Sequence, residues 1–200
     1  MYHQNGYLEI ILGTMFSGKT SYLLHKISIM TELELKVLYI NIDFDNRSTD
    51  SYSTHNPFLE NMDSKNKEKL SKFIKMIKVR NLYDIPQDLL ESSDVIMIDE
   101  AQFFEGLAIF VNNLLEKNKN IFVGSLIADF KGTKFGEALD LIPVCDNIVK
   151  LNSYCMECKK DKEYKHAVFS KKITVTEDLS NIDIGGSDKY IAVCRYHNKV

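Results

Sequence analysis

Proline and glycine are scarce in this sequence, with three prolines and nine glycines among 200 residues and no repeat or biased tract. This composition excludes fibrous and intrinsically disordered proteins. No apolar run approaches the ~20 residues that a membrane-spanning helix needs. The first residues also lack the basic and apolar regions of a secretory signal. We therefore expect a cytoplasmic protein with no membrane partner.

An excess of one charge is also missing, since 25 Lys and Arg oppose 28 Asp and Glu and give a formal net charge of −3. This balance excludes a protein that binds duplex DNA or a membrane surface through bulk charge, and we expect no nucleic-acid partner. A chain of this length buries roughly 70% of its unfolded surface, so it needs no disulfides to fold. Its four cysteines, at positions 145, 155, 158 and 194, therefore call for another explanation.

Apolar runs predict the architecture. Strand-like runs at residues 7–12 and 37–42 enclose a helical pattern that begins at Thr20, which indicates a βαβ unit with parallel strands. The fully apolar run at residues 95–98 is typical of a buried central strand, residues 121–123 predict another, and residues 148–151 predict an edge strand. Further helices are expected at residues 68–76 and 107–117, and a long polar loop at residues 44–67. After residue 151 the helical periodicity fades, and residues 172–175 and 190–193 predict short strands of a small second lobe.

Between the first strand and the first helix lies a match to the pattern G-x-x-x-x-G-K-[ST]. It consists of Gly13, Thr14, Met15, Phe16, Ser17, Gly18, Lys19 and Thr20. The glycines let backbone amides approach phosphate oxygens, and the helix N-terminus adds positive potential. We expect Lys19 to neutralise β/γ-phosphate charge and Thr20 to offer its hydroxyl to Mg²⁺. The alternative is a glycine-containing turn with a surface lysine, but the strand-loop-helix context favours a phosphate loop.

Two acidic residues, Asp99 and Glu100, directly follow the run at residues 95–98. An acid at the carboxyl end of a central strand is where a P-loop protein holds Mg²⁺, which makes Asp99 the candidate. Glu100 can then accept a proton from an attacking hydroxyl. The alternative is the acidic first turn of a helix, where the helix dipole favours such residues.

Cys155 and Cys158 form a C-x-x-C pair, and Cys194 and His197 form a C-x-x-H pair 35 residues later. Three thiolates and one imidazole make a closed tetrahedral set, which predicts a structural zinc site. A disulfide is disfavoured in a cytosolic chain. Cys145 has no partner at ligand spacing and is expected to be a buried small apolar residue.

Taken in order, these motifs make the chain resemble the type II thymidine kinases, the cellular and poxvirus-like group, over residues 7–197. The phosphate loop contains that family's Met-Phe-Ser-Gly-Lys core, and residues 99–104 are similar to its D-E-x-Q-F-F motif. The other matching segments are Asp45-Asn46-Arg47 with Thr54-His55, Cys155-Met156-Glu157-Cys158, residues 184–190, and Val193-Cys194-Arg195.

The resemblance implies ATP-dependent phosphorylation of the 5′-hydroxyl of thymidine, with Mg²⁺, a structural Zn²⁺ and a homotetrameric assembly. It implies a P-loop ATP-binding α/β domain at residues 1–151, with a mostly parallel sheet flanked by helices, and a zinc-ribbon-like lobe with the nucleoside-binding loop at residues 152–200. Glu100 is then the catalytic base. ATP and its metal are expected to contact residues 13–20 together with Asp45, Arg47, Asp99 and Gln102. The residues expected at the nucleoside are Phe130, Asn181, Ile182, Asp183, Ile184, Gly185 and Tyr190.

Other interpretations stay open on the residues alone. A P-loop switch or regulatory ATPase is one, although the N-K-x-D motif of a GTPase does not occur in the sequence. A zinc-ribbon module that binds nucleic acid or protein is another, but acidic residues interleave with the lysines at residues 157–165. Without the resemblance, Gly185-Gly186 indicates a hairpin turn, Tyr190 a half-buried strand residue, and Asp45 with Arg47 a solvated surface pair.

Overall fold

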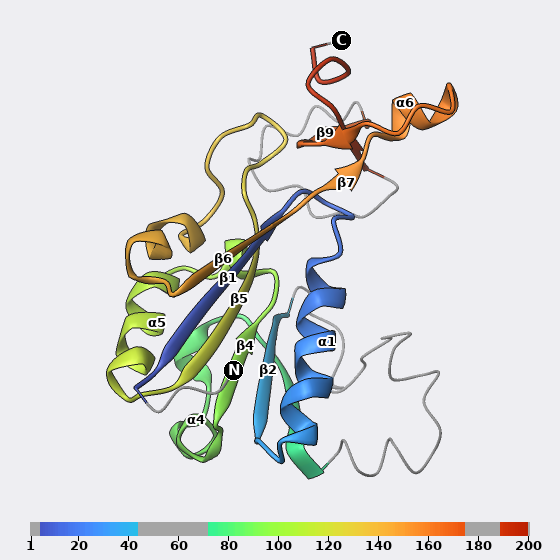
Figure 1. The fold of residues 1–200 in the computed structure, drawn as a ribbon. Helices are drawn as coiled ribbons and strands as arrows, with labels where there is room; N and C mark the ends of the chain where they lie inside the picture. Colours follow the sequence, from blue (N-terminus) through green and yellow to red (C-terminus); the bar gives the residue numbers. More distant parts are fainter. Residues whose placement is uncertain (1–4, 44–71, 175–188, 200) are drawn as a thin grey trace.

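A six-stranded sheet forms the centre of the computed structural model, which describes residues 5–43, 72–174 and 189–199 (Figure 1). The strand order is β3-β2-β4-β5-β1-β6, and every pairing between these strands is parallel. The strands are β1 (Tyr7–Gly13), β2 (Val37–Ile42), β3 (Ile74–Val79), β4 (Val95–Ile98), β5 (Asn120–Leu126) and β6 (Asn147–Leu151). The predicted α/β fold with a parallel sheet is confirmed.

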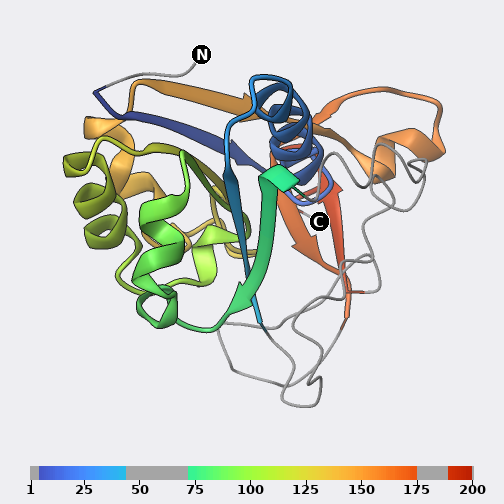
Figure 2. The ribbon, with the colours of Figure 1, turned by 90° about the horizontal axis from the view of Figure 1, so that it is seen from below.

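Helices cover both faces of the sheet, which explains why the central strands are apolar on both sides. Helix α1 (Lys19–Glu32) packs on one face, where Ile11 belongs to its apolar cluster. Helix α5 (Leu107–Glu116) packs on the opposite face with Ile10 and Leu12, so alternate residues of β1 serve different layers. Figure 2 shows α1 on the far side of the sheet from the green helices. The shorter elements on that second face are α4 (Gln87–Ser92) and the 3-10 segments η1 (Leu82–Asp84), η2 (Ala101–Phe103) and η3 (Ala138–Val144).

Of the two edge strands, one was predicted as a strand and the other as part of a helix. The predicted edge strand at residues 148–151 is confirmed as β6, which pairs only with β1 among the described strands. The predicted helix at residues 68–76 is wrong from Ile74 onward, because Ile74–Val79 is strand β3 and pairs with β2 over six residues. Its Ile-Lys-Met-Ile-Lys-Val sequence satisfies both a helical and an edge-strand pattern, and the hydrogen bonds to β2 decide between them. The predicted loop at residues 44–67 lies outside the described residues.

A small lobe follows the end of β6 and lies beyond the carboxyl ends of the central strands (Figure 1). It contains β7 (Ser153–Tyr154), α6 (Met156–Lys160), β8 (His166–Ala167), β9 (Phe169–Lys172) and β10 (Tyr190–Val193). Strands β7 and β8 form one antiparallel pair and β9 and β10 another. The predicted strand at residues 190–193 is confirmed as β10, whereas its partner β9 begins earlier than the predicted residues 172–175. In the described part of the chain, no helix has the length and apolarity to cross a membrane.

Candidate functional site

The loop between β1 and α1 surrounds a nearly buried lysine. Gly18, with a φ of 89°, precedes the first residue of α1, and Lys19 keeps only 6% of its surface exposed. The Nζ atom of Lys19 donates a hydrogen bond to the carbonyl oxygen of Thr14 at 3.0 Å, which holds its ammonium group within the loop. Burial lowers the pKa of Lys19, and this is opposed by the nearby carboxylates of Glu100 and Asp99.

Two hydroxyl groups of this loop are buried without a hydrogen-bond partner. They are Oγ1 of Thr14 and Oγ of Ser17. A buried polar group without a partner is costly, and such groups in native proteins commonly serve a ligand. Phosphate oxygens would accept hydrogen bonds from both hydroxyls and from the amides at the start of α1. The residues present therefore fit the triphosphate of a nucleotide.

Asp99 lies at the end of β4, where its carboxylate accepts three hydrogen bonds. Its Oδ2 accepts from Oγ1 of Thr20 at 2.7 Å and from the hydroxyl of Tyr39 at 2.7 Å. Its Oδ1 accepts from the backbone amide of Glu100 at 2.9 Å. Among the described residues, the two carboxylates of Asp99 and Glu100 act on Lys19 and leave an excess of negative charge, which a divalent cation would balance. A hydroxyl and a carboxylate are oxygen ligands of the kind that Mg²⁺ prefers.

Glu100 occupies a left-handed backbone position, with a φ of 51°, at the start of η2. The pKa of its carboxyl is raised, first by burial and then by the charge of Asp99, while Lys19 and Gln102 partly oppose the shift. The Nε2 atom of Gln102 donates to Oε2 of Glu100 at 2.5 Å, and its Oε1 accepts from the amide of Leu126 at 3.0 Å. Gln102, on η2, is thus anchored to the end of β5 and orients Glu100.

The small lobe meets this edge of the sheet at two places. The hydroxyl of Ser170, on β9, accepts a hydrogen bond from the backbone amide of Met15 at 3.1 Å, and so joins the lobe to the phosphate loop. The rings of Phe130 and Tyr190 lie with centroids 6.3 Å apart. The Nζ atoms of Lys131 and Lys172 lie 5.5 and 5.6 Å from the centroid of Phe130. An aromatic pair thus joins the core to the lobe.

The four predicted metal ligands come together in the lobe. Cys155, Cys158, Cys194 and His197 place one ligand atom each within 4.8 Å of one another. The two thiol sulfurs of Cys158 and Cys194 are 3.8 Å apart, and Nδ1 of His197 is 3.4 to 3.5 Å from the three sulfurs. A tetrahedral zinc ion with ordinary bond lengths separates two sulfurs by about 3.8 Å and a sulfur from a nitrogen by about 3.5 Å. The donor set therefore fits a closed, structural zinc site.

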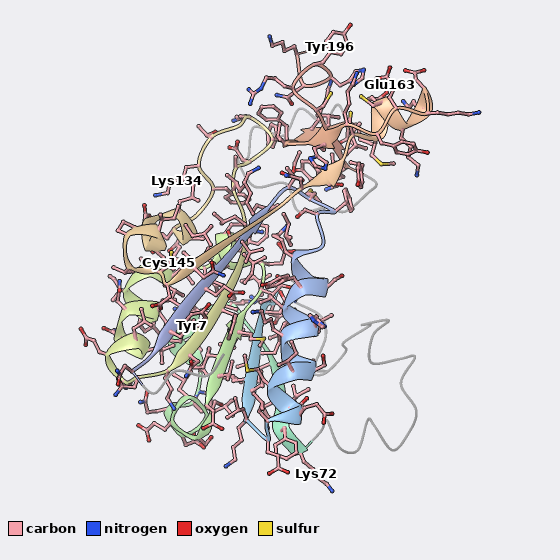
Figure 3. All side chains as sticks on the ribbon, viewed as in Figure 1. Tyr7, Lys72, Lys134, Cys145, Glu163 and Tyr196 are labelled. Atoms are coloured by element: carbon pink, nitrogen blue, oxygen red, sulfur yellow. The ribbon has the colours of Figure 1, made fainter. Side chains whose placement is uncertain are left out.

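Cys145 does not belong to this cluster. Figure 3 places it beside the sheet, away from the lobe that carries Glu163 and Tyr196. It packs partly buried against the apolar cluster below α5, which agrees with the prediction of an apolar role but not of full burial.

Comparison with known proteins shows the family of this chain. The sequence profile described as "Thymidine kinase" matches residues 6–198. The chain belongs to the thymidine kinase family. It is 33% identical over 190 residues to the thymidine kinase of Sheeppox virus (strain KS-1), which covers 95% of both chains. It is 32% identical over 190 residues to the cytosolic thymidine kinase of Homo sapiens, covering 95% of this chain and 72% of the human protein.

A solved structure of low sequence identity has a similar fold. The flagellar accessory protein FlaH from Methanocaldococcus jannaschii superimposes with a TM-score of 0.52 at 17% identity, over 74% of this chain and 71% of FlaH. At this identity the likeness concerns the fold alone.

Not all the residues expected from the thymidine kinase resemblance can be placed. The structure brings residues 13–20, Asp99, Glu100 and Gln102 to one edge of the sheet, with Phe130 and Tyr190 paired nearby. The remaining expected residues lie outside the described part of the chain. They are Asp45, Arg47, Asn181, Ile182, Asp183, Ile184 and Gly185.

Two residues at this candidate site were not predicted from the sequence. Tyr39 is the single hydroxyl-bearing side chain in the otherwise apolar first half of β2, and such a group in a buried strand is a signal that it has a polar partner. Ser170 carries no comparable signal, because its partner Met15 lies 155 residues earlier in the chain.

Proposed function

We propose that this chain transfers the γ-phosphoryl group of ATP to the 5′-hydroxyl of thymidine. Membership of the thymidine kinase family supports this reaction. The observation that carries the proposal is the meeting of Lys19, Thr20, Asp99 and Glu100 at the carboxyl edge of one parallel sheet. Phosphoryl transfer requires a cradle for the phosphates, a metal-binding acid and a group that orients the attacking hydroxyl, and these residues supply one of each.

The phosphates of ATP would occupy the loop at residues 13–20. The unpartnered hydroxyls of Thr14 and Ser17 support this placement, as does the ammonium group of Lys19 inside the loop. Thr20 and Asp99 would hold Mg²⁺, which neutralises charge on the transferred phosphoryl group when it is bound. Asp45, Arg47 and Gln102 are proposed as further ATP contacts on the strength of the resemblance.

Glu100 is proposed as the base that accepts the proton of the 5′-hydroxyl. Its raised pKa supports this role, because a general base works best when its pKa approaches the operating pH. The hydrogen bond that Gln102 donates to Oε2 leaves Oε1 of Glu100 for the substrate. The bond that Oε1 of Gln102 accepts from the backbone amide of Leu126 fixes the Gln102 side chain.

The nucleoside would bind between the core and the small lobe. The pairing of Phe130 with Tyr190 supports this site, since an aromatic surface can stack against a nucleobase. Residues 181–185 are proposed to complete it. A zinc ion held by the four ligands would fix α6 to the end of β10, which pairs with β9, so that ordering this region costs less on binding.

The remaining expectations from the resemblance are also part of the proposal. They comprise the division into an ATP-binding domain at residues 1–151 and a zinc-containing lobe at residues 152–200, a homotetrameric assembly, and a cytoplasmic location.

A coupled ATP assay across deoxythymidine, deoxyuridine and deoxycytidine tests the proposed reaction. Glu100→Gln keeps the shape of the side chain but cannot accept the proton, so kcat should fall by a factor of about 10² to 10⁴ while ATP and nucleoside still bind. Glu105→Gln, an exposed glutamate of the next turn, serves as the control and should keep wild-type turnover. Turnover of Glu100→Gln near the wild-type value would overturn the assignment of the base, and the absence of deoxythymidine phosphorylation would overturn the function.

A further inference from the structure

Tyr39 is a buried tyrosine whose hydroxyl reaches into the site from the neighbouring strand. Its ring packs in the apolar cluster beneath α1, and only 4% of the residue is exposed. Strands β2 and β4 pair directly, and their register sets Tyr39 opposite Met97, two residues before Asp99. The hydroxyl therefore extends along the sheet and donates to Oδ2 of Asp99 at 2.7 Å.

The same carboxylate oxygen also accepts the hydroxyl proton of Thr20. Because the proton of Thr20 is directed to Asp99, the lone pairs of its Oγ1 remain for a cation. Thr20 keeps this orientation only if the position of Oδ2 of Asp99 is fixed. The backbone amide of Glu100 holds the other oxygen, so Tyr39 provides the third fixed point of the carboxylate.

We propose that Tyr39 is a positioning residue for the divalent cation that accompanies ATP, acting by holding Asp99 in the orientation that directs the lone pairs of Thr20 towards the metal. The inference rests on the proposed function, because it assumes that Thr20 and Asp99 flank that cation. Tyr39 itself would touch neither metal nor nucleotide. In this bond the hydroxyl of Tyr39 is the donor, since the carboxylate of Asp99 can only accept.

Tyr39→Phe removes this single hydrogen bond and keeps the buried ring. Isothermal titration calorimetry with ATP, in magnesium buffer and in EDTA, separates metal-dependent from metal-independent binding without the use of turnover. Outer-sphere partners of metal ligands commonly contribute tenfold or more to metal affinity. We expect Tyr39→Phe to bind Mg·ATP about tenfold more weakly, equivalent to about 1.4 kcal/mol, and to bind metal-free ATP as the wild type does.

The chain offers a matched control in Tyr22. Its hydroxyl also donates to a carboxylate, Oε1 of Glu9 at 2.9 Å, but this pair lies towards the other end of β1. Tyr22→Phe therefore loses a bond of the same chemistry and should leave both ATP affinities unchanged. In an Asp99→Asn background, Tyr39→Phe should have no further effect on the ratio of the two affinities, because the carboxylate that it positions is already gone.

The outcomes distinguish the two proposals. If the wild type gains affinity from magnesium and Tyr39→Phe keeps the whole gain, the positioning role is wrong and the proposed function stands. An equal loss of both ATP affinities in Tyr39→Phe would also overturn the role, since it would indicate a general structural effect. If the wild type itself gains nothing from magnesium, both the metal site of the proposed function and this inference are wrong.

Discussion

Gly136 lies where a side chain would collide with the backbone of Gln102, whose side chain orients the proposed base Glu100. A Cβ atom at this position would lie 2.5 Å from the carbonyl oxygen of Gln102 and 2.6 Å from its Cα. Gly132, in the same loop, has a similarly positive φ, 79° against 69°, but a Cβ there would meet nothing within 4 Å. The pair Gly136→Ala and Gly132→Ala therefore separates the collision from the strain of the backbone conformation.

The structure gives a magnitude for each change. Both substitutions place an L-residue in the left-handed region, which costs about 1 kcal/mol. Gly136→Ala adds an overpacking cost of about 2 kcal/mol, because the colliding atoms are backbone and cannot rotate away. We expect a loss of about 1 kcal/mol for Gly132→Ala and about 3 kcal/mol for Gly136→Ala. For a chain of this size, the difference corresponds to about 6 °C in Tm.

Urea unfolding measures the two free energies, and the coupled kinase assay measures the functional consequence. Displacement of Gln102 in Gly136→Ala should disturb the hydrogen bond to Glu100 and lower kcat, whereas Gly132→Ala should keep the wild-type kcat. Equal destabilisation by the two substitutions would refute the reasoning, because the strain of a positive φ would then be the whole effect. A stable Gly136→Ala protein with wild-type kcat would refute it as well.

Three further predictions concern the small lobe and Glu9 on β1. Cys194→Ser removes one of the four proposed zinc ligands, so metal analysis should find zinc in the wild type and little in the variant. In the variant, amide hydrogen exchange should be faster in β9 and β10 and unchanged in the central sheet. Ser170→Ala removes the hydroxyl that accepts a hydrogen bond from the backbone amide of Met15 in the phosphate loop. Because such a bond contributes about 1 kcal/mol, the KM for ATP should rise about fivefold. The control Ser153→Ala should leave the KM for ATP unchanged. Burial raises the pKa of Glu9, but hydrogen bonds from one asparagine and two tyrosines outweigh it and lower the pKa below the ordinary value. The stability that the Glu9 carboxylate contributes is therefore complete at neutral pH. It is lost as the pH falls below the ordinary glutamate pKa and through the lower pKa that Glu9 has in the folded protein. When the free energy of unfolding is measured over a series of pH values, Glu9→Gln should therefore make its decline at acidic pH shallower.

Local patterns predicted most of the core. The four apolar residues of β4 and the strand-loop-helix pattern around Lys19 each carry their signal within a few neighbouring residues. The segment of β3 was misassigned because its apolar spacing suits a helix as well as a strand, and only its pairing with β2 settles the matter.

The candidate site likewise contains residues that local motifs predict and residues that they do not. The positions of Lys19 and Asp99 follow from motifs, whereas the partners that orient them come from distant parts of the chain. Tyr39 is 60 residues from Asp99, and Gln102 is 24 residues from the amide of Leu126 that fixes it. No sequence period connects such pairs, because they depend on strand order and register.

Strand order also explains how the phosphate loop and the acid meet. The loop follows β1 and Asp99 follows β4, and strand β5 lies between them in the sheet. A side chain on β5 at this level would separate the two, since a Cβ at Gly124 would lie 3.0 Å from Oδ1 of Asp99 and 2.9 Å from Cδ1 of Leu23 on α1. The absence of that atom lets α1 sit close enough for Thr20 to reach Asp99 at 2.7 Å. The metal-binding geometry of the proposed kinase site therefore depends on a residue that carries no chemistry of its own.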